Sequence, residues 1–233
     1  EISKVDVKPS QWSIFKSYYV ARILGVTFGV KLMEKNEQKA QKAYDELEQH
    51  YAFVAQIRED EEKHEKQLIE MINEEKLKYV GSIVLGLNDA LVELTGALAG
   101  LTFALQNSRL TALAGLVTGI AATFSMAASS YLSSKADGEE DALKSASYTG
   151  IAYLVTVALL VAPYLLLESG LMALGCMIAI AIFIIFIFNY YISIAKDLNF
   201  KRRFMEMAII SISVAGFSFL LGFVLKQFLG VDA

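Results

Sequence analysis

Several residue types are scarce in this sequence, and their scarcity excludes some classes of protein. The chain of 233 residues has 2 Pro and 1 Cys. The single Cys176 cannot form an intrachain disulfide, so cysteine usage says nothing about the redox compartment. Lys and Arg number 21 against 25 Asp and Glu, which leaves no basic surplus for contacting phosphates. We therefore exclude DNA and RNA as partners.

Apolar residues dominate what is present. They make up 55% of the chain, and the mean hydropathy of +0.45 lies above that of soluble proteins. The charges gather in the first 78 residues and in short loops. The lipid bilayer is therefore predicted to be the main solvent of this chain. No cleavable signal peptide is visible at the polar N-terminus, so the first hydrophobic span is expected to act as its own insertion signal.

Five hydrophobic runs are long enough to cross a bilayer, which takes about 20 apolar residues in a helix. The predicted spans are residues 79–106, 110–133, 148–167, 171–195 and 205–228. The basic residues on one side are Lys76, Lys78, Lys135, Lys144, Lys196, Lys201, Arg202 and Arg203, and those on the other are Arg109 and Lys226. The positive-inside rule then predicts a multi-pass protein of the cell (inner) membrane, with a cytoplasmic N-terminus and an outside C-terminus.

Residues 1–78 are predicted to form a cytoplasmic helical region that precedes a transmembrane domain at 79–233. A first helix is expected at about 10–33, where no acidic residue occurs. Three basic residues interrupt this helix: Lys16, Arg22 and Lys31. It is therefore too polar to span and should pack on a partner helix or lie in the membrane interface. Residues 37–78 lack Pro and Gly and are rich in helix formers, which predicts one long helix or two nearly collinear ones.

Glu61 and His64 occupy positions of this long helix where the apolar repeat calls for core residues. Their Glu-x-x-His spacing places both side chains on the same face, as metal ligands in helical bundles are placed. The neighbouring Glu62 and Glu65 are further candidate ligands. A helix rich in Glu and Lys is also typical of a solvated coiled-coil face, so both interpretations stay open.

The first span carries two acids, Asp89 and Glu93, together with Asn88. Residues four apart lie about 40° from each other around a helix, so both carboxylates can line one surface. Two anions this close inside a membrane cannot both stay charged without a cation or a proton. The pair suits binding of a divalent cation in exchange for protons. The alternatives are that both acids are protonated, or paired with a basic residue, although none lies at depth in the other four spans.

The second span contains many small residues, which would let another helix approach closely. They include Ala121, Ala122, Ser125, Ala128 and Ser129. Met126 lies among them and is either core filler or a thioether ligand. The glycines of the first span, Gly86, Gly96 and Gly100, indicate tight packing and fit helix dimerisation equally well.

The run LGLNDALVELTGALAGL, followed by FSMAASSYLSSKA, resembles the vacuolar iron transporter family. The resemblance covers Val80 to about Gln227 and rests on Asn88-Asp89 and on Ser125 to Ala128. It implies a homodimer of five-span chains that exports Fe²⁺, and often Mn²⁺, from the cytosol in exchange for protons. It also implies that Asp89 and Met126 lie on the ion path and that the protein is not an enzyme.

Ser130 departs from that family pattern, which commonly has Glu at this position. A neutral hydroxyl is a weaker ligand for a hard divalent ion. Either Glu93 supplies the missing charge, or transport is impaired in this chain. The following loop, SKADGEEDALKSAS, is too short for the metal-binding insert of plant and fungal relatives, although its acids could attract cations.

The run EDEEKHEKQLIEMI resembles the second helix of a rubrerythrin-like or ferritin-like half-bundle, a module fused to such transporters in prokaryotes. The resemblance implies that two helical hairpins, one from each chain, close into a four-helix bundle with bound metal. Glu61 and His64 match its motif. The first-helix Glu has no counterpart, since residues 11–33 contain no acid, and His50 is another possible contributor.

The sequence thus predicts an all-α membrane protein that exports divalent metal by proton antiport, with N-terminal helices collecting the ion. One rival is a membrane-anchored ferritin-like oxidase or peroxidase, against which the missing first-helix acid argues. A second is a metal-binding or storage protein without flux, and a third is a transporter of another solute. Carboxylate, thioether and imidazole ligands serve several metals, so the sequence does not rank Fe²⁺, Mn²⁺, Co²⁺ and Zn²⁺.

Overall fold

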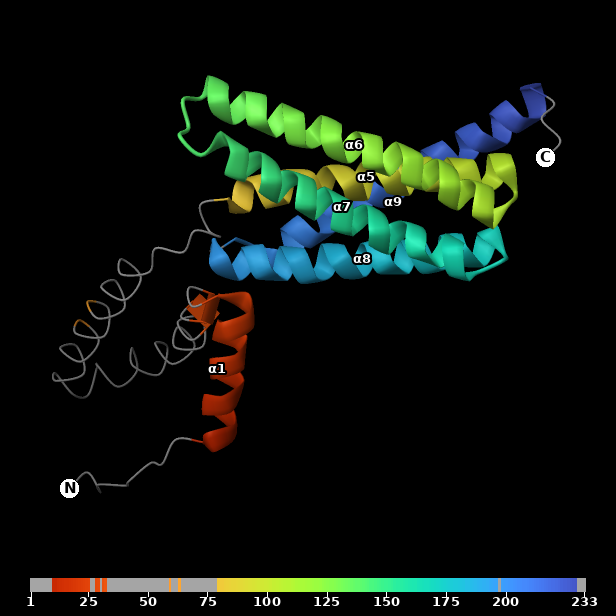
Figure 1. Ribbon diagram of the computed structural model, residues 1–233. Coiled ribbons are helices and arrows are strands. Elements are labelled where there is room, and N and C mark those ends of the chain that lie inside the picture. Colours follow the sequence, from red (N-terminus) through yellow and green to blue (C-terminus); the bar gives the residue numbers. More distant parts are fainter. Residues whose placement is uncertain are drawn as a thin grey trace. The chain divides into compact units, whose positions relative to one another are not determined.

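A computed structural model describes residues 10–25, 28–29, 31–32, 59, 63, 79–196 and 198–229. Every regular element in this part of the chain is a helix (Figure 1). Five of these helices are long and apolar enough to cross a membrane. The predicted all-α class with five spans is therefore confirmed for the described residues.

The chain divides into two compact units. One comprises Glu1–Leu77 with Tyr191–Leu198, and the other comprises Lys78–Tyr190 with Asn199–Ala233. The predicted domains, 1–78 and 79–233, stay a prediction.

In the first unit, helix α1 runs from Gln11 to Leu24. The predicted single helix at about 10–33 is interrupted: α1 ends at Leu24, and the described residues 28–29 and 31–32 are helical again. Gly25 follows α1 with φ 101°, a left-handed backbone that ends the helix and that glycine adopts at no steric cost. Beyond it the Phe28 side chain is 2% exposed and stacks on the ring of Tyr191, with the ring centroids 5.1 Å apart.

Two isolated residues between positions 33 and 78, Glu59 and Lys63, are also described. Lys63 Nζ lies 2.7 Å from Glu59 Oε1, one helical turn away. This charged hydrogen bond holds the pKa of the Glu59 carboxyl below its ordinary value. The predicted ligands Glu61, Glu62, His64 and Glu65, and His50 with them, lie outside the described residues, so the predicted metal site there stays a prediction.

The second unit contains the spanning helices. They are α5 (Val80–Leu105), α6 (Ser108–Ala136), α7 (Ala142–Leu166), α8 (Gly170–Ala195, which ends in the first unit) and α9 (Phe200–Leu229). Helices α7 and α9 begin earlier than the predicted 148 and 205, because hydropathy marks only the apolar part of a helix. The first turns of α9 are charged, and Arg202 there donates to Glu206 at 2.9 Å.

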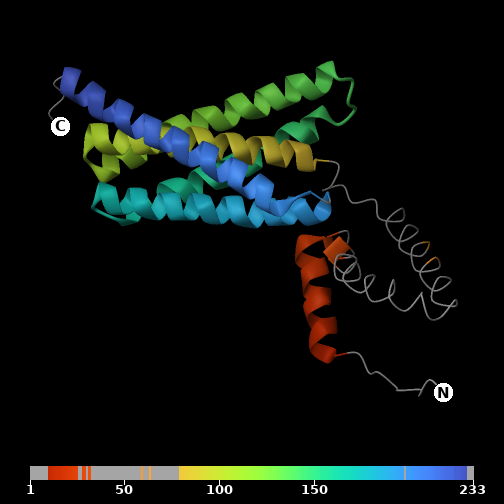
Figure 2. The same ribbon diagram turned by 180° about the vertical axis from the view of Figure 1, so that it is seen from behind.

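Helix α5 is the centre of this unit. It packs against α6, α7 and α9, and α6 also packs against α7. Figures 1 and 2 view the unit from opposite sides, with α7 in front of α5 in the first and α9 in front of it in the second. The core between α5 and α7 is formed by large apolar side chains that are almost fully buried. They are Leu91, Leu94 and Leu98 with Tyr153, Val157, Leu160, Val161 and Tyr164.

Two glycines allow the close helix approaches in this core. A Cβ atom built on Gly86 of α5 would clash with the carbonyl oxygen of Thr149 in α7. Likewise, a Cβ atom on Gly222 of α9 would clash with the carbonyl oxygen of Gly100 in α5. The predicted tight packing at Gly86 and Gly100 thus occurs within one chain.

Candidate functional site

The acids of α5 lie in the middle of an otherwise apolar helix. Asp89 is half-buried and Glu93, one turn later, is exposed. The neighbouring Leu91 and Leu94 point into the core and are at most 1% exposed. Because the core contacts fix the rotation of α5, the two acids emerge together on another face of the helix, as their spacing predicts.

Tyr153 of α7 forms a hydrogen bond with Glu93. Its hydroxyl donates a hydrogen bond of 2.7 Å to Glu93 Oε2, while its side chain is 0% exposed. A hydrogen bond from a buried, rigid ring restricts the carboxylate to few rotamers. The structure therefore brings Asp89, Glu93 and Tyr153 together as one polar group on two helices.

Tyr153 was not among the residues predicted for the site, although the sequence contains a signal for it. Ser145, Thr149, Tyr153 and Thr156 follow each other along α7 at spacings of four, four and three residues. All four are buried. This repeat marks a hydroxyl-bearing face of α7, and hydroxyl groups inside a membrane bond either to carbonyls of their own helix or to polar groups of another helix.

No basic residue neutralises the acid pair within the described part of the chain. The ion pairs found there outside the N-terminal segment are Lys144 with Asp141 and Arg202 with Glu206. The described residues also contain no group of three or more His, Cys, Asp or Glu side chains that could hold a metal. Asp89 and Glu93 of one chain would thus supply two carboxylates to an ion, fewer than a complete ligand set.

The other predicted ion-path residues are more dispersed. Met126 of α6 is half-buried and packs against the apolar core, and Asn88 is half-buried on α5. Ser125 and Ser129 are exposed on α6. The structure places Met126 as a core side chain, and its role as a thioether ligand stays a prediction.

Ser130 lies in a buried cluster of hydroxyl groups where α5, α6 and α7 meet. Its Oγ lies 2.9 Å from Thr149 Oγ1 and 3.3 Å from Ser145 Oγ. Ser145 Oγ also lies 2.7 Å from Ser82 Oγ and 3.0 Å from Ser134 Oγ. A pocket of about 250 Å³ borders this cluster, with Glu139 in its wall. The neutral Ser130 side chain therefore contributes to the packing of α6 against α7.

Replacing Thr149 by Val tests the contribution of this cluster to stability. The Thr149 hydroxyl is buried within hydrogen-bond distance of Ser130 Oγ and of the Ser82 carbonyl oxygen, and Val keeps the shape but loses both contacts. We expect a loss of about 0.6 to 2 kcal/mol, the range for hydrogen bonds between membrane helices. Thermal unfolding in detergent measures it. Thr118→Val, at an exposed position of α6, is the matched control, and an equal melting temperature for both variants would contradict the expectation.

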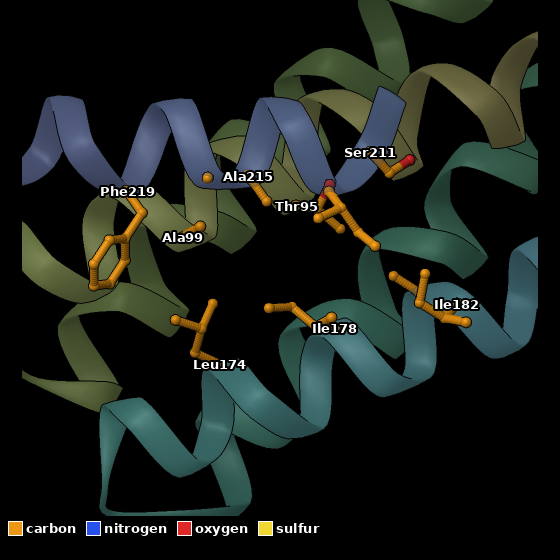
Figure 3. Close-up of a pocket in the computed structure, with 11 residues that line it drawn as sticks. Thr95, Ala99, Leu174, Ile178, Ile182, Ser211, Ala215 and Phe219 are labelled. Carbon is orange, nitrogen blue, oxygen red and sulfur yellow. The ribbon is translucent and has the colours of Figure 1, made fainter. Parts of the chain in front are cut away.

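A cavity of about 310 Å³ lies between α5, α8 and α9 (Figure 3). Its wall is apolar apart from the hydroxyls of Thr95 and Ser211. The Thr95 hydroxyl donates to the carbonyl oxygen of Leu91 in its own helix. The wall has no charged group, and two neutral hydroxyls are a poor replacement for the water shell of a divalent ion.

Comparison with known proteins supports one of the predicted resemblances. The sequence model of the VIT family matches residues 80–141, which comprise α5, α6 and the turn that follows. This match includes Asp89, Glu93, Met126 and Ser130, and it supports the resemblance to vacuolar iron transporters. A search of curated proteins finds no match to this chain. Together with the five apolar helices, the family match supports a multi-pass membrane protein that transports divalent metal.

Proposed function

We propose that this chain exports Fe²⁺, with Mn²⁺ as a second substrate, from the cytosol in exchange for protons. The observation that carries the proposal is the acid pair of α5. Asp89 and Glu93 lie within a helix long and apolar enough to span the membrane, no described basic residue pairs with them, and Tyr153 holds Glu93 at 2.7 Å. The VIT-family match covers both acids.

The exchange follows from the chemistry of the two carboxylates. Without a metal ion, a proton reduces the charge that the membrane interior has to accommodate. A divalent cation needs ionised carboxylates as ligands, so its arrival displaces protons. Tyr153 donates to only one lone pair of Glu93, which leaves the other carboxylate oxygen for the metal.

A homodimer completes this site. Glu93 is exposed in the single chain although it lies inside a spanning helix. A carboxylate that faced lipid there would cost about 2.5 to 3.5 kcal/mol on insertion scales. A second copy placed against this face would cover Glu93 and bring a second acid pair to the same ion path. Exposed small residues of α6, Ser125 and Ser129, would let helices approach closely at such an interface.

The transporter lies in the cell (inner) membrane with its N-terminus in the cytoplasm, as the distribution of basic residues favours. Its N-terminal helical hairpins pair across the dimer into a four-helix bundle. In that bundle Glu61, Glu62, His64 and Glu65 collect the metal and deliver it to the spanning domain.

Metal uptake into proteoliposomes tests this function. We expect Fe²⁺ and Mn²⁺ to enter vesicles with an acidic lumen, and to enter much more slowly without a pH gradient. Protein-free vesicles are the control. Tight metal binding with zero flux would favour a storage protein, and oxygen or peroxide consumption on adding Fe²⁺ without flux would favour a ferritin-like enzyme. Either outcome would overturn the proposed transport.

A further inference from the structure

Helix α1 carries an exposed set of aromatic side chains. Trp12 is 73% exposed, Phe15 56%, Tyr18 57% and Tyr19 45%. Their rings touch in sequence: the centroids of Trp12 and Phe15 are 6.3 Å apart, those of Phe15 and Tyr19 4.4 Å, and those of Tyr18 and Tyr19 5.5 Å. At about 100° per residue these four positions fall within an arc of about 120°. We call these four residues the aromatic strip.

The charge of this segment has one sign. Arg22 falls within the same arc and donates from Nη1 to the Tyr18 hydroxyl at 3.0 Å. Lys16 adds a second positive charge to α1, while residues 10–33 contain no Asp or Glu. The strip therefore combines large apolar rings, phenolic hydroxyls and a guanidinium group, with no acid of its own segment to balance the charge.

We infer that the aromatic strip of α1 docks on the anionic surface of a lipid bilayer. Tyr and Trp have an apolar body and a polar edge, which suits them to the headgroup layer. A helix in this layer buries one face to the depth of the acyl boundary, and basic side chains strengthen its binding to anionic lipids. Arg22 lies where its guanidinium group can bind a lipid phosphate.

Two other placements of α1 fit the observations less well. With 14 residues it is about 21 Å long, too short to cross a hydrocarbon core of about 30 Å. Packing of the strip against the same strip of a second copy would bring two Arg22 side chains together. No acid within 10–33 would then be available to pair with them, and a buried unpaired charge is strongly unfavourable.

The single Trp of the chain makes this inference testable without a label. Trp12 lies in the strip, so all tryptophan emission of this chain reports on α1. We expect blue-shifted emission in vesicles that contain phosphatidylglycerol, and loss of most of that emission when the lipids carry bromine high on their acyl chains. Emission typical of water without quenching would overturn the inference. Blue-shifted emission without quenching would also overturn it, because protein would then cover the strip.

A charge variant tests the electrostatic part. Arg22→Gln is expected to lower the partition coefficient of the strip on phosphatidylglycerol vesicles about fivefold. This factor corresponds to the loss of about 1 kcal/mol, the contribution of one basic residue near an anionic surface. High salt should have a similar effect on the parent protein. Arg109→Gln removes an exposed charge elsewhere and serves as the matched control. Equal quenching in phosphatidylglycerol and phosphatidylcholine vesicles, for parent and variant alike, would contradict a specifically anionic docking surface.

Discussion

Glu93→Gln is expected to lower proton-driven metal uptake at least about tenfold while leaving the protein folded. The variant keeps the size of the side chain and can still accept a hydrogen bond from Tyr153 through its amide oxygen. It removes the negative charge and the proton-binding group that the proposed exchange requires. A charged ligand lost from a desolvated site costs about 1.5 to 3 kcal/mol or more, so uptake at low metal concentration should fall at least about tenfold. Asp89→Ala and Glu93→Ala should have effects of the same size.

Tyr153→Phe separates the positioning of Glu93 from its charge. Phe fills the same buried space and retains the carboxylate, but it no longer donates the hydrogen bond that orients Glu93. We expect weaker apparent metal affinity with partial flux, between the parent and Glu93→Gln. Glu206→Gln makes the same chemical change on α9, where the acid pairs with Arg202, and should transport like the parent. Parental uptake by both Glu93→Gln and Asp89→Ala would make the mechanism wrong.

Gly86→Ala is expected to destabilise the packing of α5 against α7. The added methyl group would meet the Thr149 carbonyl oxygen, which belongs to the backbone and cannot rotate away. Helices α5 and α7 would have to separate, at a cost of about 1 to 3 kcal/mol for overpacking. The contacts on either side of Gly86, Ser82 with Ser145 and Tyr153 with Glu93, would lengthen at the same time.

Thermal unfolding in detergent measures this effect, and metal uptake shows whether the site is disturbed with it. Gly81→Ala is the matched control, since a Cβ atom there has no neighbour within 4 Å. This control should unfold at or above the parental temperature, because Ala favours a helix over Gly by up to about 1 kcal/mol. If Gly86→Ala unfolds at the same temperature as the parent protein, the close approach of α5 to α7 does not contribute to stability.

The ends of the helices illustrate where prediction from the sequence succeeds and where it fails. The five spans were predictable because their length and hydropathy are local properties that the bilayer imposes on any spanning helix. The start of α7 at Ala142 could not be predicted, because its first turns are polar and are stabilised by hydroxyl contacts with α5 and α6. The end of α1 depended on the backbone conformation of a single glycine, Gly25.

For the candidate site, the sequence by itself determined the acids. Asp89 and Glu93 are conspicuous inside an apolar run, and their spacing of four places them on one side of α5 whatever surrounds that helix. Only the tertiary structure decided their partner. Tyr153 is 60 positions from Glu93, and the contact exists because Gly86 lets α7 approach α5 and because the buried leucines fix the rotation of α5. Spacing along one helix is local chemistry, whereas the meeting of two helices depends on the packing of the whole bundle.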